Sequence, residues 1–287
     1  MTLTRRRCMQ ALVFVGVELG LIGVATVPRV DAKRHYPHGT PSPTATPTPT
    51  SGSGMPTTDL PGWKLIFNDD FTTPVAEGQF PADDRWYAYP YGWQDTSKNG
   101  TYDPSIISIH DGLLDAYIRT TNGVHRVAAF GPRLPNGTGW ENSCQLYGRY
   151  AVRFKVDSMH GYKGAWLLWP QSDNWPTDGE IDFPEGDFDS TISAFMHHQG
   201  GTSGSSQDAF PTSAVWTSWH TTVTEWTPTA VRFYLDGTLI GTSTSAIPNT
   251  PMRFDIQNET TLDGIVPADS VSGHVLVDWV AEWAYAP

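Results

Sequence analysis

The fold is decided by the run Y-G-R-Y-A-V-R-F-K-V at residues 147–156. Tyr150, Val152 and Phe154 fall on one parity of this run, and Arg153 and Lys155 fall on the other. Successive side chains of a strand point to opposite faces, so this alternation predicts an antiparallel strand with one face buried. The run therefore indicates a sheet that covers a core on one side.

Short runs of the same kind, rich in aromatic and β-branched residues, recur along the chain between turn residues. They include K-L-I-F at 64–67, D-G-L-L-D-A-Y-I at 111–118, T-I-S-A-F-M-H-H at 191–198 and V-L-V-D-W-V at 275–280. Asp236-Gly237, inside the run 231–239, predicts a hairpin with a type I′ turn. No segment predicts a helix of ordinary length. Many short antiparallel strands in one chain predict an all-β protein with a β-sandwich fold.

The N-terminal part has a different composition. Arg5, Arg6 and Arg7 precede a short apolar stretch that contains Glu18, which predicts a cleaved export signal over residues 1–32 rather than a retained membrane anchor. A linker rich in Pro, Thr and Ser follows over residues 33–58. We therefore expect the sandwich to span residues 59–287 of a secreted protein.

Charge and cysteine content limit the partners. The 287 residues carry a formal net charge of −12; residues 1–34 contribute +4, which leaves −16 for the rest. An acidic surface of this kind is a poor partner for nucleic acid. Cys8 lies in the leader and Cys144 has no second cysteine to pair with, so we expect no intramolecular disulfide. We expect a monomer with no stable membrane association after the signal is removed.

Three carboxylates are concentrated in D-G-E-I-D-F-P-E-G at residues 178–186. Glu180 and Asp182 share one face of a strand, whereas Glu185 belongs to the other face by parity. A β-bulge at Pro184 resets the alternation, because proline cannot donate to the ladder and is tolerated at bulges. With this reset, all three acids point to the same side.

Such an arrangement predicts acid–base chemistry. The two glutamates flank Asp182 over about 13 Å of strand, and leaning inward they approach the spacing of about 5 to 5.5 Å used by retaining glycosidases. Repulsion among the acids raises the pKa of at least one of them. The alternatives are a calcium site or a solvated acidic face; the alternation of the acids with Ile181 and Phe183 argues against a calcium loop.

Several blocks of sequence, in order, resemble glycoside hydrolase family 16, and in particular its β-glucanases of the laminarinase and lichenase type. The segment E-I-D-F-P-E at 180–185 is similar to the family signature E-x-D-x-x-E, and further similar blocks are Y-G-R-Y-A-V-R-F-K-V before it and M-H-H and V-L-V-D-W-V after it. The resemblance covers nearly all of residues 63–284. It implies a concanavalin-like jelly roll of two curved antiparallel sheets with a glycan cleft on the concave side.

The resemblance also implies roles for the site residues. Glu180 is implied as the nucleophile, Glu185 as the general acid/base, and Asp182 as the residue that orients the nucleophile. We expect that no cofactor takes part in catalysis. Residues implied or considered as sugar contacts are Trp175, Trp166, Trp169, Trp140, His198 in preference to His197, and Gln257.

A structural calcium on the convex side is a further implication. By position its ligands are Asp70, the backbone of Gly112, and Asp278. Two departures from the family pattern leave the sugar specificity open: K-G-A-W-L-L-W-P at 163–170 differs from the usual Trp-Pro-Ala-Trp-rich run, and Pro184-Glu185-Gly186 is an unusual end to the signature.

Together these features predict a retaining endo-glycosidase for a neutral β-linked polysaccharide, with β-1,3 or mixed β-1,3/1,4 glucan as the first expectation. Only 12 Arg and Lys residues lie beyond residue 34, which argues against a sulfated or uronate substrate. A galactan substrate or transglycosylation remains open, because a sugar hydroxyl can intercept the same covalent intermediate. The alternative from another class is a lectin on the same sandwich.

Overall fold

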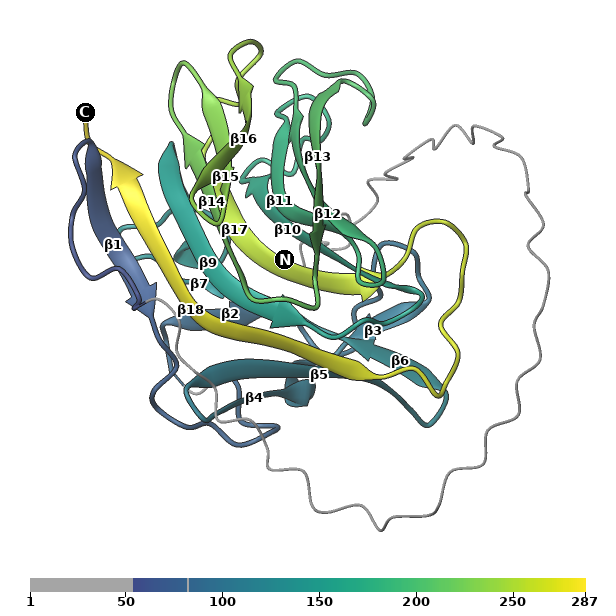
Figure 1. Ribbon diagram of the computed structural model, residues 1–287. Coiled ribbons are helices and arrows are strands. Elements are labelled where there is room, and N and C mark those ends of the chain that lie inside the picture. Colours follow the sequence, from purple (N-terminus) through teal and green to yellow (C-terminus); the bar gives the residue numbers. More distant parts are fainter. Residues whose placement is uncertain (1–53, 82) are drawn as a thin grey trace, which may run out of the picture.

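A computed structural model describes residues 54–81 and 83–287 (Figure 1). The predicted export signal and most of the predicted linker lie outside the described residues. Within the described part, helix is confined to two 3₁₀ turns, Pro104–Ile106 and Trp140–Asn142. No helix in that part is long and apolar enough to cross a membrane.

The strands form two large sheets. The ten-stranded sheet runs in the order β16-β15-β14-β9-β18-β5-β6-β3, with β1 paired to β18 and β4 paired to β5. Its strands are β1 Trp63–Asp69, β3 Gly100–Tyr102, β4 Ile107–His110, β5 Leu113–Thr121, β6 Val124–Val127, β9 Gly148–Val156, β14 His220–Trp226, β15 Val231–Leu235, β16 Thr238–Ser243 and β18 Gly273–Tyr285.

The eight-stranded sheet runs in the order β13-β12-β11-β10-β17-β7-β2, with β8 paired to β17. Its strands are β2 Trp86–Ala88, β7 Ala129–Pro132, β8 Cys144–Gln145, β10 Tyr162–Pro170, β11 Glu180–Asp187, β12 Thr191–His197, β13 Gln207–Val215 and β17 Met252–Thr260. Among the described pairs only β3 and β6 run parallel. Figure 1 shows the pronounced curvature of the long strands β9, β17 and β18.

The alternation in β9 is confirmed. Tyr150, Val152, Phe154 and Val156 all enter the apolar core between the sheets. The predicted hairpin is also confirmed, because β15 and β16 meet at Asp236 and Gly237 with φ angles of 49° and 80°, the positive values that a type I′ turn requires. Sequence periodicity therefore predicted the architecture where strands bury one face.

The core between the sheets is rich in large rings, whose burial stabilises the sandwich. Its fully buried members include Trp166, Trp216, Phe154 and Phe188. Cys144 is a buried free thiol, and burial raises its pKa to about 11. The thiol therefore remains protonated and packs as a small apolar group.

Candidate active site

The three acids lie on β11, on the face of the eight-stranded sheet that points away from the core. Ile181 and Phe183 enter the core between the sheets, so Glu180 and Asp182 point the opposite way. The pairing of β11 with both neighbouring strands shifts register between Asp182 and Glu185. This irregularity surrounds Pro184, where the bulge was predicted, and the Phe183–Pro184 peptide bond is cis.

The cross-strand partners of β11 show that the shift returns Glu185 to the outer face. On β10, Leu167 pairs with Asp182 and Ala165 pairs with Glu185. Leu167 and Ala165 are two residues apart, so their side chains share a face, and paired residues point to the same side of a sheet. Asp182 and Glu185 therefore share that face as well.

His197 on β12 completes a buried polar cluster. It pairs with Glu180 across the sheet, and its Nε2 lies 3.4 Å from Asp182 Oδ2 and 3.8 Å from Glu180 Oε2. The indole of Trp175 meets the His197 ring edge-on, with centroids 6.0 Å apart. Glu180, Asp182 and His197 are 5%, 2% and 6% exposed, so their interactions are little screened by water.

Burial sets the protonation of two of these acids. Burial, reinforced by the Asp182 charge, raises the pKa of Glu180 well above its usual range, and His197 opposes the rise. Burial, reinforced by the Glu185 charge, likewise raises the pKa of Asp182, against the attraction of Lys163. Like charges at this separation disfavour double ionisation. The cluster therefore retains a proton near neutral pH.

Glu180, Asp182 and His197 are also the group of His, Cys, Asp and Glu side chains in the described residues that has the geometry to hold a metal ion. Their ligand atoms lie within 4.8 Å of one another. One imidazole and two carboxylates suit a transition metal better than calcium, which takes six to eight oxygen ligands. The arrangement thus weakens the alternative of a calcium site at the acids.

Comparison with family models decides the classification. The model of the glycosyl hydrolases family 16 matches residues 129–281, which is more than half of the chain. The chain belongs to glycosyl hydrolase family 16. This family 16 protein is a glycoside hydrolase, and its two sheets form the jelly-roll sandwich of that family. Curated protein sequences gave no match.

Several solved structures have a similar fold. The laminarinase from Rhodothermus marinus has a TM-score of 0.63 at 20% identity, covering 78% of this chain and 98% of that one. SCLam, a non-specific endo-β-1,3(4)-glucanase from family GH16, has a TM-score of 0.62 at 19% identity, covering 80% and 94%. LamA from Z. galactanivorans, solved with laminaritriose and laminaritetraose, has a TM-score of 0.58 at 22% identity, covering 76% and 98%.

The predicted tryptophan platforms divide into core and surface residues. Trp166 is fully buried in the core between the sheets, so its prediction as a sugar contact is wrong. Trp166 pairs across the sheet with Ile256 on β17, which is also a core residue. The side chains of paired residues point to the same face, so Trp166 points into the core. Trp169 and Trp175 are half-buried, and their rings lie nearly parallel with centroids 6.5 Å apart.

Trp140 contacts residues of β2 and β17 and of the segment after β2. Its ring contacts Tyr87 and Tyr89 edge-on, and the Arg253 guanidinium lies 5.0 Å from its centroid. Trp140 is half-buried. Its surroundings make it part of a polar and aromatic wall rather than a neighbour of the three acids.

Of the two histidines considered as sugar contacts, His197 rather than the preferred His198 lies beside the acids. His198 Nε2 lies 3.1 Å from Asp208 Oδ1, whereas His197 is the cross-strand partner of Glu180. Gln257 is on the acid face, because it pairs with Ala165, which itself pairs with Glu185. The half-buried Gln257 therefore lies two strands from the proposed acid/base.

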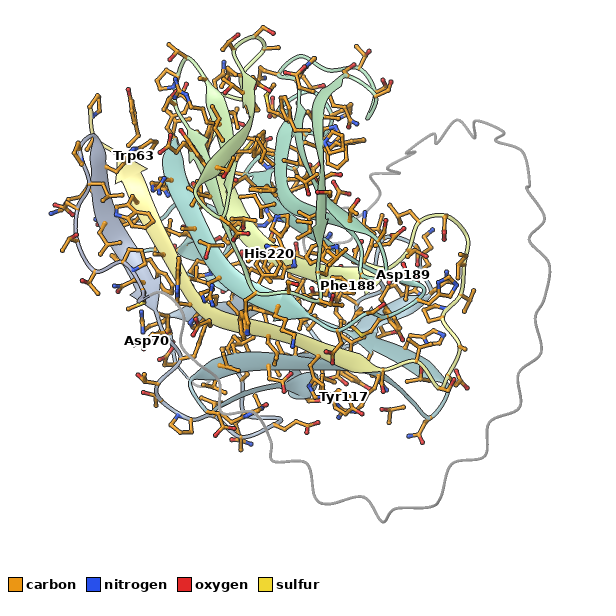
Figure 2. All side chains as sticks on the ribbon, viewed as in Figure 1. Trp63, Asp70, Tyr117, Phe188, Asp189 and His220 are labelled. Carbon is orange, nitrogen blue, oxygen red and sulfur yellow. The ribbon has the colours of Figure 1, made fainter. Side chains whose placement is uncertain are left out.

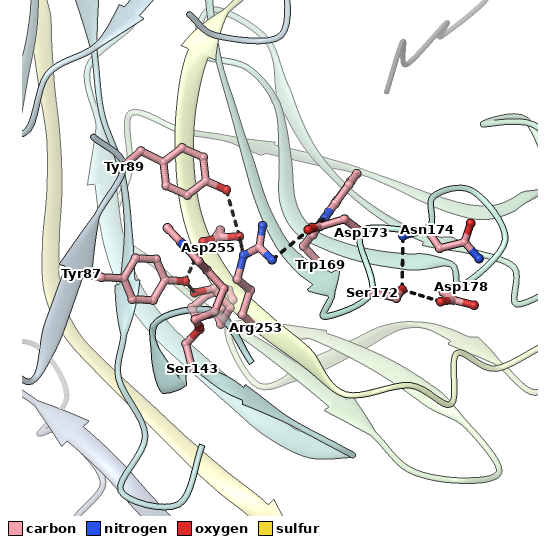
Figure 3. A network of polar contacts seen from close by, with 12 residues as sticks. Tyr87, Tyr89, Ser143, Trp169, Ser172, Asp173, Asn174, Asp178, Arg253 and Asp255 are labelled. Atoms are coloured by element: carbon pink, nitrogen blue, oxygen red, sulfur yellow. Dashed lines mark hydrogen bonds and ion pairs between the residues drawn. The ribbon is translucent and has the colours of Figure 1, made fainter. Parts of the chain in front are cut away.

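Two charged groups on the same face escaped sequence reasoning. Lys163 on β10 forms an ion pair with Glu185, at 2.8 Å between Nζ and Oε1. On β17, Arg253 Nε donates to Asp255 at 2.9 Å, and the Tyr87 hydroxyl donates to the same carboxylate at 2.6 Å (Figure 3). Two features of the sequence could have indicated these groups. Lys163 is a lysine within an otherwise apolar strand, and Arg253 and Asp255 are two residues apart, so they share a face of their strand.

The residues proposed for calcium converge on the ten-stranded sheet. Asp69 pairs with Val280 and Leu114 pairs with Val277, and these registers place Asp70 and Gly112 beside Asp278; Figure 2 labels Asp70 after β1. Burial raises the pKa of Asp278, and the Asp70 charge adds to the rise.

Arg153 already binds Asp278 Oδ2 at 2.9 Å. Two carboxylates and a backbone carbonyl are hard oxygen donors that suit calcium. The Arg153 guanidinium would compete with the ion for the Asp278 carboxylate.

Proposed function

We propose that this family 16 glycoside hydrolase is a retaining endo-glycosidase that cleaves β-1,3 or mixed β-1,3/1,4 glucan by double displacement. The observation that carries the proposal is the register shift in β11, which places Glu180, Asp182 and Glu185 on one face of the sheet. Two glutamates and a central aspartate on one surface supply the nucleophile, the acid/base and the proton-sharing partner that such a reaction needs.

In the first step, Glu180 attacks the anomeric carbon, and the bond to the leaving oxygen breaks as Glu185 gives that oxygen its proton. Attack requires ionised Glu180. His197 favours this form through its charge, and the indole of Trp175 lies close enough to favour it too, although its Nε1 has no hydrogen bond of normal geometry. In the second step, Glu185 takes a proton from water, whose oxygen displaces Glu180 with retained configuration.

A neutral substrate is supported by the charges around the acids. Lys163 is paired with Glu185, and Arg253 is paired with Asp255 and lies 3.5 Å from Asp173. Cations already bound to carboxylates are poor receptors for sulfate or uronate groups. A glucan is supported by the fold neighbours, which include a laminarinase and an endo-β-1,3(4)-glucanase.

We further propose that the protein is exported, acts as a monomer and needs no cofactor for catalysis, with a structural calcium near Asp278. The basic and apolar leader supports export. The oxygen donors around Asp278 support calcium, which would hold the β1 and β5 ends together and takes no part in the reaction.

Product analysis of the full chain tests the proposal. Laminarin, mixed-linkage glucan, xyloglucan, agarose and arabinogalactan are incubated with wild type, Glu180→Gln, Glu185→Gln and the surface control Glu77→Gln. We expect oligosaccharides from a β-glucan with wild type and control, and a loss of about 10²–10⁴-fold in the two site variants. Equal binding of one polymer by all four proteins without cleavage would establish a lectin, and cleavage of agarose or arabinogalactan alone would replace the glucan assignment.

A further inference from the structure

Lys163 lies beside the proposed acid/base and is as buried as the acids themselves. It projects from β10 on the outer face of the eight-stranded sheet, on the parity of Ala165, the cross-strand partner of Glu185. Its ammonium is 2.8 Å from Glu185 Oε1, and the two side chains are 9% and 14% exposed. This contact is thus a short, largely desolvated ion pair within the site.

A buried ammonium is costly unless carboxylates compensate for the lost water. Around Lys163 they come from two strands: Asp182, Glu185 and Asp187 on β11, and Glu259 on β17. Burial is the largest influence and lowers the pKa of Lys163, but the charge and hydrogen bond of Glu185, together with the charges of Glu259 and Asp182, outweigh it and leave that pKa above its usual range. Lys163 is therefore positively charged at neutral pH.

The resulting charge pattern corresponds to one stage of the proposed reaction. Burial raises the pKa of Glu180 and of Asp182, while Glu185 is ion-paired with Lys163. In a glycosyl-enzyme intermediate Glu180 is an uncharged ester and Glu185, having given up its proton, is a carboxylate. The ammonium of Lys163 thus stands, before any sugar arrives, where the Glu185 carboxylate of this intermediate needs a positive charge.

We propose that Lys163 is a positioning residue that holds Glu185 through Oε1 and stabilises its carboxylate once the proton has passed to the leaving oxygen. The inference rests on the retaining mechanism proposed above. As the glycosidic bond breaks, the proton moves from Glu185 to the departing hydroxyl and the negative charge remains beside the ammonium. In the second step the same carboxylate, still anchored, takes a proton from water, so Lys163 neither gives nor receives one.

Substrates with different leaving groups separate this role from a merely structural one. The full-length wild type, Lys163→Met, Lys163→Arg and the control Lys155→Met, whose lysine lies on β9 of the other sheet, are assayed on laminarin and on 2,4-dinitrophenyl β-laminaribioside. Dinitrophenolate leaves without protonation, so the first-turnover burst reports the attack of Glu180 alone. We expect Lys163→Met to lose about 10²-fold in kcat on laminarin and less than about threefold in burst rate. Lys163→Arg should recover most of the loss.

A double-mutant cycle covers the case in which Lys163→Met folds poorly. Lys163→Met leaves the Glu185 carboxylate unpaired and should lower Tm, whereas Lys163→Met combined with Glu185→Gln removes both charges and should recover it. In the Glu185→Gln background, Lys163→Met should change the laminarin rate by less than about twofold.

Equal losses of laminarin rate and burst rate, or an undiminished effect of Lys163→Met when Glu185 is already Gln, would overturn the positioning role. Failure of the proposed function itself gives a different result, because wild type would then cleave neither substrate or would release products of inverted anomeric configuration.

Discussion

Replacement of Trp166 tests whether this side chain belongs to the core or to the sugar-binding surface. Its ring is fully buried and packs edge-on against Phe154, with centroids 4.7 Å apart, and against Trp216 at 6.0 Å. Its Nε1 donates a hydrogen bond of 3.2 Å to Asn258 Oδ1, which is also buried. Trp166→Ala therefore opens a cavity and leaves an acceptor without its donor.

The two costs are of known size. Truncation of a buried tryptophan costs about 3–5 kcal/mol, and a buried acceptor left unsatisfied costs about 1–3 kcal/mol. Their sum, about 4–8 kcal/mol, is comparable to the whole stability of a typical domain, about 5–15 kcal/mol. Trp166→Phe keeps most of the volume and loses the hydrogen bond, so we expect a smaller loss of about 1–3 kcal/mol.

Urea unfolding followed by tryptophan fluorescence gives the free energy of unfolding, and initial rates on laminarin give KM. Trp175→Ala is the matched comparison, because its half-buried ring lies beside His197. We expect Trp166→Ala to lower stability severely, and Trp175→Ala to raise KM or lower kcat with a much smaller loss of stability. A stable Trp166→Ala variant with a raised KM would refute the assignment of this side chain to the core.

Three further predictions follow from the buried charges. Burial raises the pKa of Glu282 well above 4.5, so its contribution to stability is complete below pH 4.5 and is lost as pH rises toward the folded-state pKa. Glu282→Gln should therefore gain about 1.4 kcal/mol over wild type per pH unit in that window, and parallel stability curves would contradict this. Calcium at 100-fold excess over Kd should stabilise wild type by about 2.7 kcal/mol but not Asp278→Asn; an equal effect on both proteins would move the ion elsewhere. His197→Phe should lower kcat on laminarin while His198→Phe should not, and the reverse order would contradict the placement of His197.

The fold was largely predictable because it depends on the alternation of apolar and polar residues within each strand. The burial of Tyr150, Val152 and Phe154 on one face could be predicted from the two-residue repeat of a β-strand alone. The bulge at Pro184 was predictable for the same reason, since three acids that act together cannot otherwise share a face. These inferences need no knowledge of neighbouring strands.

The departures from the predictions concern contacts that depend on which strands are neighbours and, for the tryptophans, a parity that was not applied. His197 and His198 differ only in parity, and the choice requires the pairing of Glu180 with His197, which no local pattern supplies. Trp166 and Trp169 are an odd number of residues apart, so parity alone excluded both from one face of a regular strand. The partnership of Lys163 with Glu185 needs the register between β10 and β11.

The central claim is that Glu180 is the nucleophile of a retaining glycosidase, and a trapped intermediate tests it most directly. The full chain is incubated with 2,4-dinitrophenyl 2-deoxy-2-fluoro-β-laminaribioside, digested and analysed by mass spectrometry. The account predicts a covalent fluorosugar on Glu180, with no label in Glu180→Gln. A label on Asp182 or Glu185, or cleavage of laminarin with inverted anomeric configuration, would contradict it.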